Sequence, residues 1–132
     1  MANSQIELQK KVDSAASFLL QEKGYVSAVD VLQKIGVLSK VDYENWRFAR
    51  VDYLERVCKI SRKELSVINN EIRAYARKHE LKPSFTDYRK WGKGGNIRLR
   101  FSKSGENNIE KSYATHYLSS QKVTRNTDGK DE

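Results

Sequence analysis

The sequence predicts a mainly helical domain of four or five helices with a small β-hairpin near its C-terminal end. Apolar residues recur every three or four positions through most of the first part of the chain, which is the period of amphipathic helices. After Pro83, the only proline, residues 96–102 alternate apolar and polar side chains, which is the period of a half-buried strand. We expect residues 1–118 to form one domain and residues 119–132, which are almost without apolar side chains, to be a disordered tail.

The first two predicted helices are separated by Gly24. Residues 5–21 carry apolar side chains at helical spacing and form the first helix. Ser27 then precedes a short second helix that ends at Gly36, and Asp30 follows Ser27 by three positions. This spacing is a variant of the capping box, in which a serine oxygen accepts a hydrogen bond from an amide of the first helical turn.

Two more helices are predicted to begin with the same serine signal. The third begins after Ser39 and bends near residues 49–51, and the fourth begins after Ser61 and runs to about Glu80. In both cases an acidic residue follows the serine by three positions. A short closing helical element is expected where apolar and aromatic residues return to helical spacing, at Ile109, Tyr113, His116 and Tyr117.

The β element is expected at residues 85–103. The glycine-rich run at residues 92–95 is turn chemistry, and in the strand after it Arg98 and Arg100 share the outer face. Residues 84–91 fit either the partner strand of a hairpin or a helical turn, and we favour the hairpin. A basic hairpin of this kind resembles the wing of a winged-helix domain.

The formal net charge of +8 is concentrated in one third of the chain. Residues 61–104 hold twelve Lys and Arg against four Asp and Glu, whereas the segments before and after carry +1 and −1. A local excess of positive charge attracts polyanions, and nucleic acid is the polyanion that this balance favours.

The predicted fourth helix carries a stripe of cationic and amide side chains without an acidic residue. Its members recur at steps of three and four residues and therefore share one face: Lys63, Ser66, Asn70, Arg73 and Arg77. Arg and Lys neutralise phosphates, and Arg and Asn hydrogen-bond to base edges. The alternative is a solvated charged face with ion pairs to Glu64 and Glu71.

We therefore expect binding to DNA or RNA, mainly by phosphate contacts from this helix and the hairpin. The candidate nucleic-acid-binding residues, which we expect to converge on one face, are Lys63, Asn70, Arg73, Arg77, Lys93, Arg98 and Arg100. Residues 30–41 are also similar to a helix-turn-helix. There, however, Leu32 stands where a small residue is expected, and Asp42 and Glu44 would repel phosphate, so a packed helical pair is favoured.

A protein partner is the main alternative to nucleic acid. Trp46 and Phe48 cannot easily share one buried helix face, so an exposed aromatic patch formed by Trp46, Phe48 and Tyr53 would favour an interaction module or adaptor.

We expect neither enzymatic activity nor a bound metal or cofactor. The single cysteine, Cys58, excludes an internal disulfide, and His79 and His116 have no partners at metal-ligand spacing. The glycine run at residues 92–95 is followed by a predicted strand, whereas a phosphate-binding loop opens a helix and has Ser or Thr after its Lys. No apolar stretch approaches the ~20 residues of a membrane span, and no signal peptide is recognisable, so we expect a cytoplasmic protein with no membrane contact.

Two blocks of the chain resemble a family of small bacterial proteins of no known function. The first is Trp-Arg-x-x-Arg-x-x-Tyr-Leu-Glu at residues 46–55, and the second is Leu-Arg-Phe-Ser-Lys-Ser-Gly at residues 99–105. The resemblance spans about residues 28–118. The family usually has Gly and Pro where this chain has Ala49 and Asp52. The resemblance implies a bacterial-type cytoplasmic protein and assigns no functional residues.

Overall fold

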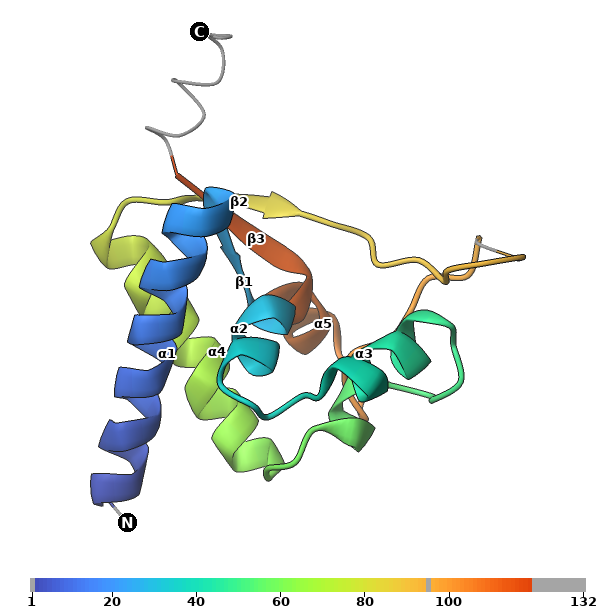
Figure 1. The fold of residues 1–132 in the computed structure, drawn as a ribbon, viewed down its shortest axis with the longest axis horizontal. Helices are drawn as coiled ribbons and strands as arrows, with labels where there is room; N and C mark the ends of the chain where they lie inside the picture. The colour runs from blue at the N-terminus through green and yellow to red at the C-terminus, as the bar shows by residue number, and fades with distance from the viewer. Residues whose placement is uncertain (1, 95, 120–132) are drawn as a thin grey trace, which may run out of the picture.

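A computed structural model describes residues 2–94 and 96–119, and in these residues it contains five α-helices, a short 3₁₀ helix and a three-stranded antiparallel sheet (Figure 1). The predicted mainly helical fold with a small β element is confirmed. The elements follow one another as α1 (Ala2–Lys23), β1 (Tyr25–Ser27), α2 (Ala28–Lys34), α3 (Lys40–Arg47), the 3₁₀ helix (Leu54–Val57), α4 (Arg62–Lys78), β2 (Lys82–Phe85), α5 (Asn107–Ala114) and β3 (Thr115–Leu118).

The two longest helices, α1 and α4, pack side by side along one edge of the molecule (Figure 1). Both bury an apolar stripe whose residues are at most 5% exposed: Val12, Ala15, Ala16 and Leu19 in α1, and Leu65, Ile68 and Ile72 in α4. Burial of an aliphatic side chain of this size stabilises a fold by ~1.5–3 kcal/mol. This stripe holds α4 against the core and leaves its opposite face in solvent.

The three predicted serine caps are confirmed. The Oγ atoms of Ser27, Ser39 and Ser61 each accept a hydrogen bond from the backbone amide three residues later, at 3.2, 3.0 and 3.1 Å. Only Ser61 forms the complete capping box, because the side chain of Glu64 accepts in return from the Ser61 amide at 3.1 Å. The predicted stop at Gly36 also holds, with a φ of 85° that glycine adopts without strain.

The third helix is shorter than its periodicity predicts. It ends at Arg47, and Ala49 takes a φ of 61°, so the predicted bend is a break in the helix. The 3₁₀ helix then begins with Leu54, whose amide donates to the carbonyl of Arg100 at 3.1 Å, while the Glu55 amide donates to Phe101 at 2.9 Å. The chain leaves the helical path here because its backbone pairs with a distant segment.

The sheet is built from segments that the sequence did not predict as strands. β3 lies between β1 and β2 and is antiparallel to both. The closing helix predicted around residues 109–117 therefore ends at Ala114, and His116 and Tyr117 belong to β3. The apolar spacing of these residues suits a helix as well as a strand, and pairing with two neighbouring strands decides between them.

The predicted hairpin forms with very little regular strand. Residues 96–102 form no extended ladder, and the pairing consists of a bridge between Arg89 and Arg98, flanked by the hydrogen bonds Lys90 N–H to Ile97 O at 2.9 Å and Leu99 N–H to Tyr88 O at 2.8 Å. The helical turn considered for residues 84–91 is absent. The hairpin projects from the body of the molecule beyond α3 (Figure 1).

Ser119 is the last described residue, and its amide donates to the Gly24 carbonyl at 3.0 Å. The rest of the predicted tail, residues 120–132, lies outside the described residues. Within the described part of the chain, no helix combines the length and the apolar character that crossing a membrane requires.

Candidate nucleic-acid interface

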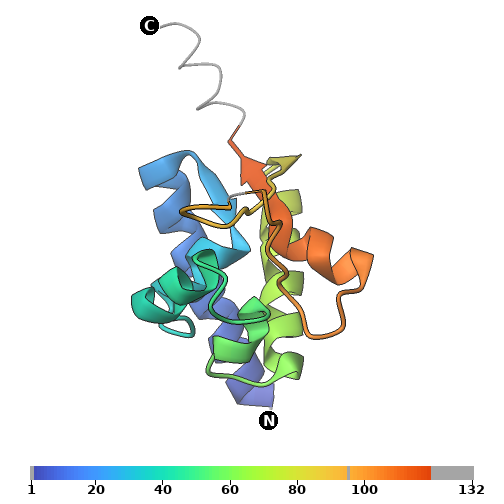
Figure 2. The same ribbon diagram turned by 90° about the vertical axis from the view of Figure 1, so that its right-hand side faces the viewer.

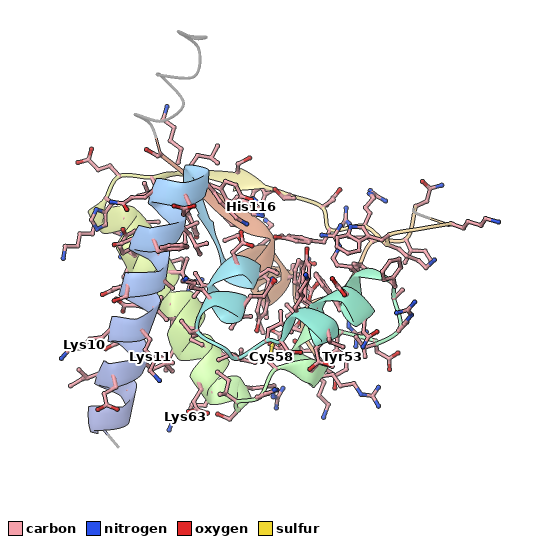
Figure 3. The ribbon with its side chains drawn as sticks, in the orientation of Figure 1. Lys10, Lys11, Tyr53, Cys58, Lys63 and His116 are labelled. Carbon is pink, nitrogen blue, oxygen red and sulfur yellow. The ribbon has the colours of Figure 1, made fainter. Side chains whose placement is uncertain are left out.

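The solvent-facing side of α4 carries the predicted basic stripe. Leu65, Ile68 and Ile72 turn inwards, so the stripe on the opposite side of the helix is exposed throughout: Lys63, Ser66, Asn70, Arg73 and Arg77. Lys63 extends outwards from the N-terminal end of the helix (Figure 3). The helical spacing in the sequence therefore placed these five side chains on one face correctly.

This face forms one wall of a groove between α4 and α5, which we call the α4–α5 groove. Its volume is about 360 Å³, and it is lined by Glu55, Arg62, Lys63, Ser66, Asn69, Asn70, Arg73, Ser104, Ile109, Ser112 and Tyr113. Three cationic side chains line the groove against the single carboxylate of Glu55. The groove is therefore positive and rich in hydrogen-bonding groups, which suits a phosphate chain.

The carboxylate of Glu55 is already engaged within the fold. Its two oxygens accept hydrogen bonds from the Tyr113 hydroxyl at 2.8 Å and from the Lys103 amide at 3.0 Å. Burial, reinforced by the negative charge of Glu55, raises the pKa of the Tyr113 phenol, so it remains a donor to Glu55. Glu55 thus anchors α5 and the loop before it.

Arg73 is held in position by neutral partners. Its guanidinium donates to Ser112 Oγ of α5 at 2.8 Å and to Asn70 Oδ1 on its own helix. Neither partner neutralises its charge. Because both hydrogen bonds are to neutral oxygens, a phosphate could replace either of them with a stronger, charge-assisted bond.

The ion pairs expected under the solvated-face alternative are not formed within the described residues. None of the ion pairs there involves Lys63, Arg73 or Arg77. Glu64 is used in the capping box of Ser61, and Glu71 faces Asp13 of α1.

Arg77 extends the positive face towards the sheet. Burial raises the pKa of the Tyr117 phenol in β3, and the positive charges of Arg73 and Arg77 act in the opposite direction. Both arginines therefore lie near the same tyrosine, and α4 presents positive charge from Lys63 at its start to Arg77 in its last turn.

The structure does not bring the hairpin candidates to this face. Arg98 and Arg100 line a different cavity, which lies across α5 from the α4–α5 groove. Arg98 pairs with Asp87 at 3.5 Å, and Arg100 donates to the Ser102 carbonyl at 2.9 Å. Lys93 lies in the turn of the projecting hairpin. The expected convergence therefore holds for the α4 residues only.

Sequence reasoning missed several groove residues. Arg62 lies four positions before Ser66 and Asn69 four positions before Arg73, so the helical spacing was enough to find them. Ser104 and Ser112 reach the groove only because α5 packs beside α4. No local signal in the sequence indicates that packing.

The aromatic patch expected for a protein partner is less exposed than the sequence predicts. Trp46 is fully buried, and Phe48 is 36% exposed with its ring against Trp91 at a centroid distance of 5.5 Å. Trp91 itself is 37% exposed, and Tyr53 is half-buried. Each exposed ring in the pair is partly covered by the other.

The remaining candidate residues take part in packing. Cys58 points towards the body of the molecule (Figure 3), and burial raises the pKa of its thiol to about 12, so the nucleophilic thiolate is suppressed. The His79 ring contacts the Tyr75 ring in a tilted arrangement, and His116 hydrogen-bonds to the Tyr88 hydroxyl at 2.9 Å. Among residues 2–94 and 96–119, no cluster of three or more His, Cys, Asp or Glu side chains is arranged to hold a metal ion.

Comparison of the chain with protein-family models, curated proteins and solved structures finds no match. The resemblance to a bacterial family therefore stays a prediction.

Proposed function

We propose that the protein binds nucleic acid along the exposed face of α4 and in the α4–α5 groove, chiefly by neutralising phosphates. The observation that carries the proposal is that Lys63, Arg73 and Arg77 share one exposed face of α4. None of them forms an ion pair with an acidic side chain within the described residues. Three unpaired cations on one helix repel one another, and an anion relieves that repulsion.

The order of the elements supports the same proposal. When α3, the 3₁₀ helix and α5 are set aside, the elements follow one another as α1, β1, α2, α4, β2 and β3, and the strands are arranged in the order β1-β3-β2. This is the order of a winged-helix domain, in which the helix before the second strand faces the nucleic acid. That position is occupied by α4. On this interpretation α3 and the 3₁₀ helix are an insertion before α4, and α5 lies within the wing connection.

In the proposed complex Lys63, Arg73 and Arg77 contact phosphates, and Asn70 reaches a base edge once Arg73 turns to a phosphate. Asparagine pairs bidentately with adenine in a duplex major groove, so Asn70 is the residue to which we assign direct readout. The same proposal gives the protein a cytoplasmic location, where nucleic acid is accessible.

The test is binding to short labelled duplex DNA, single-stranded DNA and RNA at several salt concentrations, measured by fluorescence anisotropy. The double variant Lys63→Ala with Arg73→Ala removes two surface charges. For duplex DNA we expect weaker binding and a log–log salt slope that is smaller by about two, because each neutralised phosphate contributes ~0.9 to that slope.

A matched control removes two positive charges from another side of the molecule. Lys40 begins α3 and Arg50 follows it, and both are exposed. In Figure 2, α3 lies on the side of the molecule opposite α5. Lys40→Ala with Arg50→Ala should leave the salt slope nearly unchanged. Equal losses in both variants, or no binding of any probe at low salt, would overturn the proposal.

A further inference from the structure

A second cavity lies across α5 from the α4–α5 groove, between α5 and the hairpin. We call it the hairpin pocket. Its volume is about 380 Å³, within the range of small-ligand sites, and its lining includes Phe85, Tyr88, Arg98, Arg100 and Lys111. Figure 2 shows α5 at one side of the molecule, next to the chain that returns from the hairpin. The two cavities are lined by opposite faces of α5.

The pocket combines an apolar floor with an exposed aromatic ring. Tyr88, Leu99 and Phe101 are buried and form its base, whereas Phe85, at the end of β2, is 66% exposed. The Lys111 ammonium lies 5.8 Å from the centroid of the Phe85 ring. A largely exposed aromatic ring with a cation close to it is suited to stack on a nucleobase whose phosphate reaches that cation.

The carboxylates of the pocket are already satisfied within the fold. Glu110 accepts from the amides of Phe101 and Ser102 at 3.0 and 2.8 Å and from the Ser102 hydroxyl at 2.6 Å. Asp87 lies between Arg89 and Arg98, at 3.3 and 3.5 Å.

The cations of the pocket are less completely neutralised. Arg100 and Lys111 take part in none of the ion pairs within the described residues. Arg98 shares the single carboxylate of Asp87 with Arg89. The rim therefore keeps an excess of positive charge above an apolar floor.

We propose that the hairpin pocket binds one nucleotide unit, with its base stacked on Phe85 and its phosphate held by Lys111 and Arg98. The unit is either a free mononucleotide or one nucleotide of a single strand, because both present the same base and phosphate. Stacking on an aromatic ring tolerates any base, so we expect little base preference. The site is separate from the α4 face, so this inference does not rest on the proposed function.

The experiment is an isothermal titration of the full chain at low salt with four probes: adenosine monophosphate, adenosine, inorganic phosphate and a short single-stranded oligonucleotide. Phe85→Ala should weaken nucleotide binding about tenfold, the effect typical of losing one stacked base. Lys111→Gln should weaken binding of the monophosphate and leave that of adenosine unchanged.

Phe18 and Lys34 provide a matched control. Phe18 is 44% exposed, and the Lys34 ammonium lies 3.7 Å from its ring centroid, on the α1 and α2 side of the molecule. Phe18→Ala therefore removes a similar cation-covered ring and should not change nucleotide binding. Because both rings are exposed, circular dichroism should show both variants folded.

Loss of binding in Phe85→Ala but not in Phe18→Ala supports the pocket, and the preferred probe then identifies the source as free nucleotide or single strand. The absence of binding by the monophosphate and the oligonucleotide at millimolar concentration, or binding that Phe85→Ala leaves unchanged, overturns it. Duplex binding that depends on Lys63 and Arg73 would survive that failure, so the two proposals fail separately.

Discussion

Trp46 is the side chain that joins α3 to the returning strand of the hairpin. It is fully buried, its ring packs on Tyr88 and Phe101 at centroid distances of 5.5 and 5.2 Å, and its Nε1–H donates to the Arg100 carbonyl at 2.8 Å. Trp46→Phe removes this donor and leaves unfilled space, so we expect a loss of about 2 kcal/mol in the free energy of unfolding. Urea denaturation followed by circular dichroism measures this loss.

Phe48 is the control for that prediction, two positions along the chain and 36% exposed. Phe48→Leu should cost less than about 0.5 kcal/mol, as for other surface positions. A cost for Trp46→Phe no greater than that for Phe48→Leu would contradict the central role of Trp46.

The raised pKa of Glu71 predicts that the free energy of unfolding depends on pH. Burial between α1 and α4, with a hydrogen bond to Asp13 and the negative charge of Asp13, raises the pKa of Glu71 from 4.5 to about 7. Between these two pH values the folded state keeps a proton that the unfolded state has lost. The free energy of unfolding should therefore fall as pH rises from about 5 to about 7.

Glu71→Gln removes the titration but keeps a hydrogen-bond donor for Asp13. We expect this variant to match the wild type near pH 5 and to be the more stable of the two near pH 8. Urea denaturation at both pH values is the measurement, and a parallel pH dependence in the two proteins would refute the assignment to Glu71.

At the scale of single residues, the sequence predicts what depends on near neighbours. The three serine caps needed only a spacing of three, and the opposite environments of Trp46 and Phe48 followed from helical geometry. The partners of Arg98 and Arg100 could not be predicted in this way. Arg98 pairs with Asp87 and Arg100 donates to the Ser102 carbonyl only because the hairpin folds as it does.

At the scale of elements, the hairpin depends on Arg47 for its attachment to α3. The Arg47 guanidinium lies 4.7 Å from the Trp91 ring centroid and 5.1 Å from that of Tyr88, and it donates to the Arg89 carbonyl at 3.1 Å. The Arg47 carbonyl accepts from the Trp91 amide at 2.8 Å. Arg47 thus holds the outgoing strand of the hairpin by its backbone and its side chain.

Arg47→Lys should loosen the hairpin without unfolding the domain, because an ammonium cannot stack on both rings and still reach the Arg89 carbonyl. We expect faster hydrogen exchange at the amides of Trp91 and Leu99, by about tenfold, with the α4 amides unchanged. If exchange became faster at all amides, or did not change at the hairpin amides, Arg47 would not be the residue that attaches the hairpin to α3.

The helices were predictable and the strands were not, for one physical reason. A helix such as α4 satisfies its own backbone, so its apolar period identifies it locally. β1 has three residues, β2 is wholly exposed, and β3 continues directly from α5, so none of them shows a clear alternation. The paired residues lie far apart in the chain, at most 93 positions for Tyr25 with Leu118.

At the scale of the whole molecule, α5 decides how the basic segment is divided. The four α4 candidates lie on a single helix, so their shared face could be predicted from spacing alone. The position of α5 beside α4 separates that face from Arg98 and Arg100, and it creates two cavities where the sequence predicted one continuous surface. The contact depends on Arg73 with Ser112 and on Glu55 with Tyr113, which are far apart in the chain.

The most direct test of the central claim is a ¹H–¹⁵N NMR titration with the nucleic acid that binds best. If α4 and its groove form the interface, the largest amide shifts should lie in residues 62–77, with smaller shifts at Ser104 and Ser112. At the same concentration of nucleic acid, these shifts should be smaller in the variant that lacks Lys63 and Arg73. Shifts confined to α3 and the hairpin, with α4 unchanged, would contradict the claim that α4 binds nucleic acid.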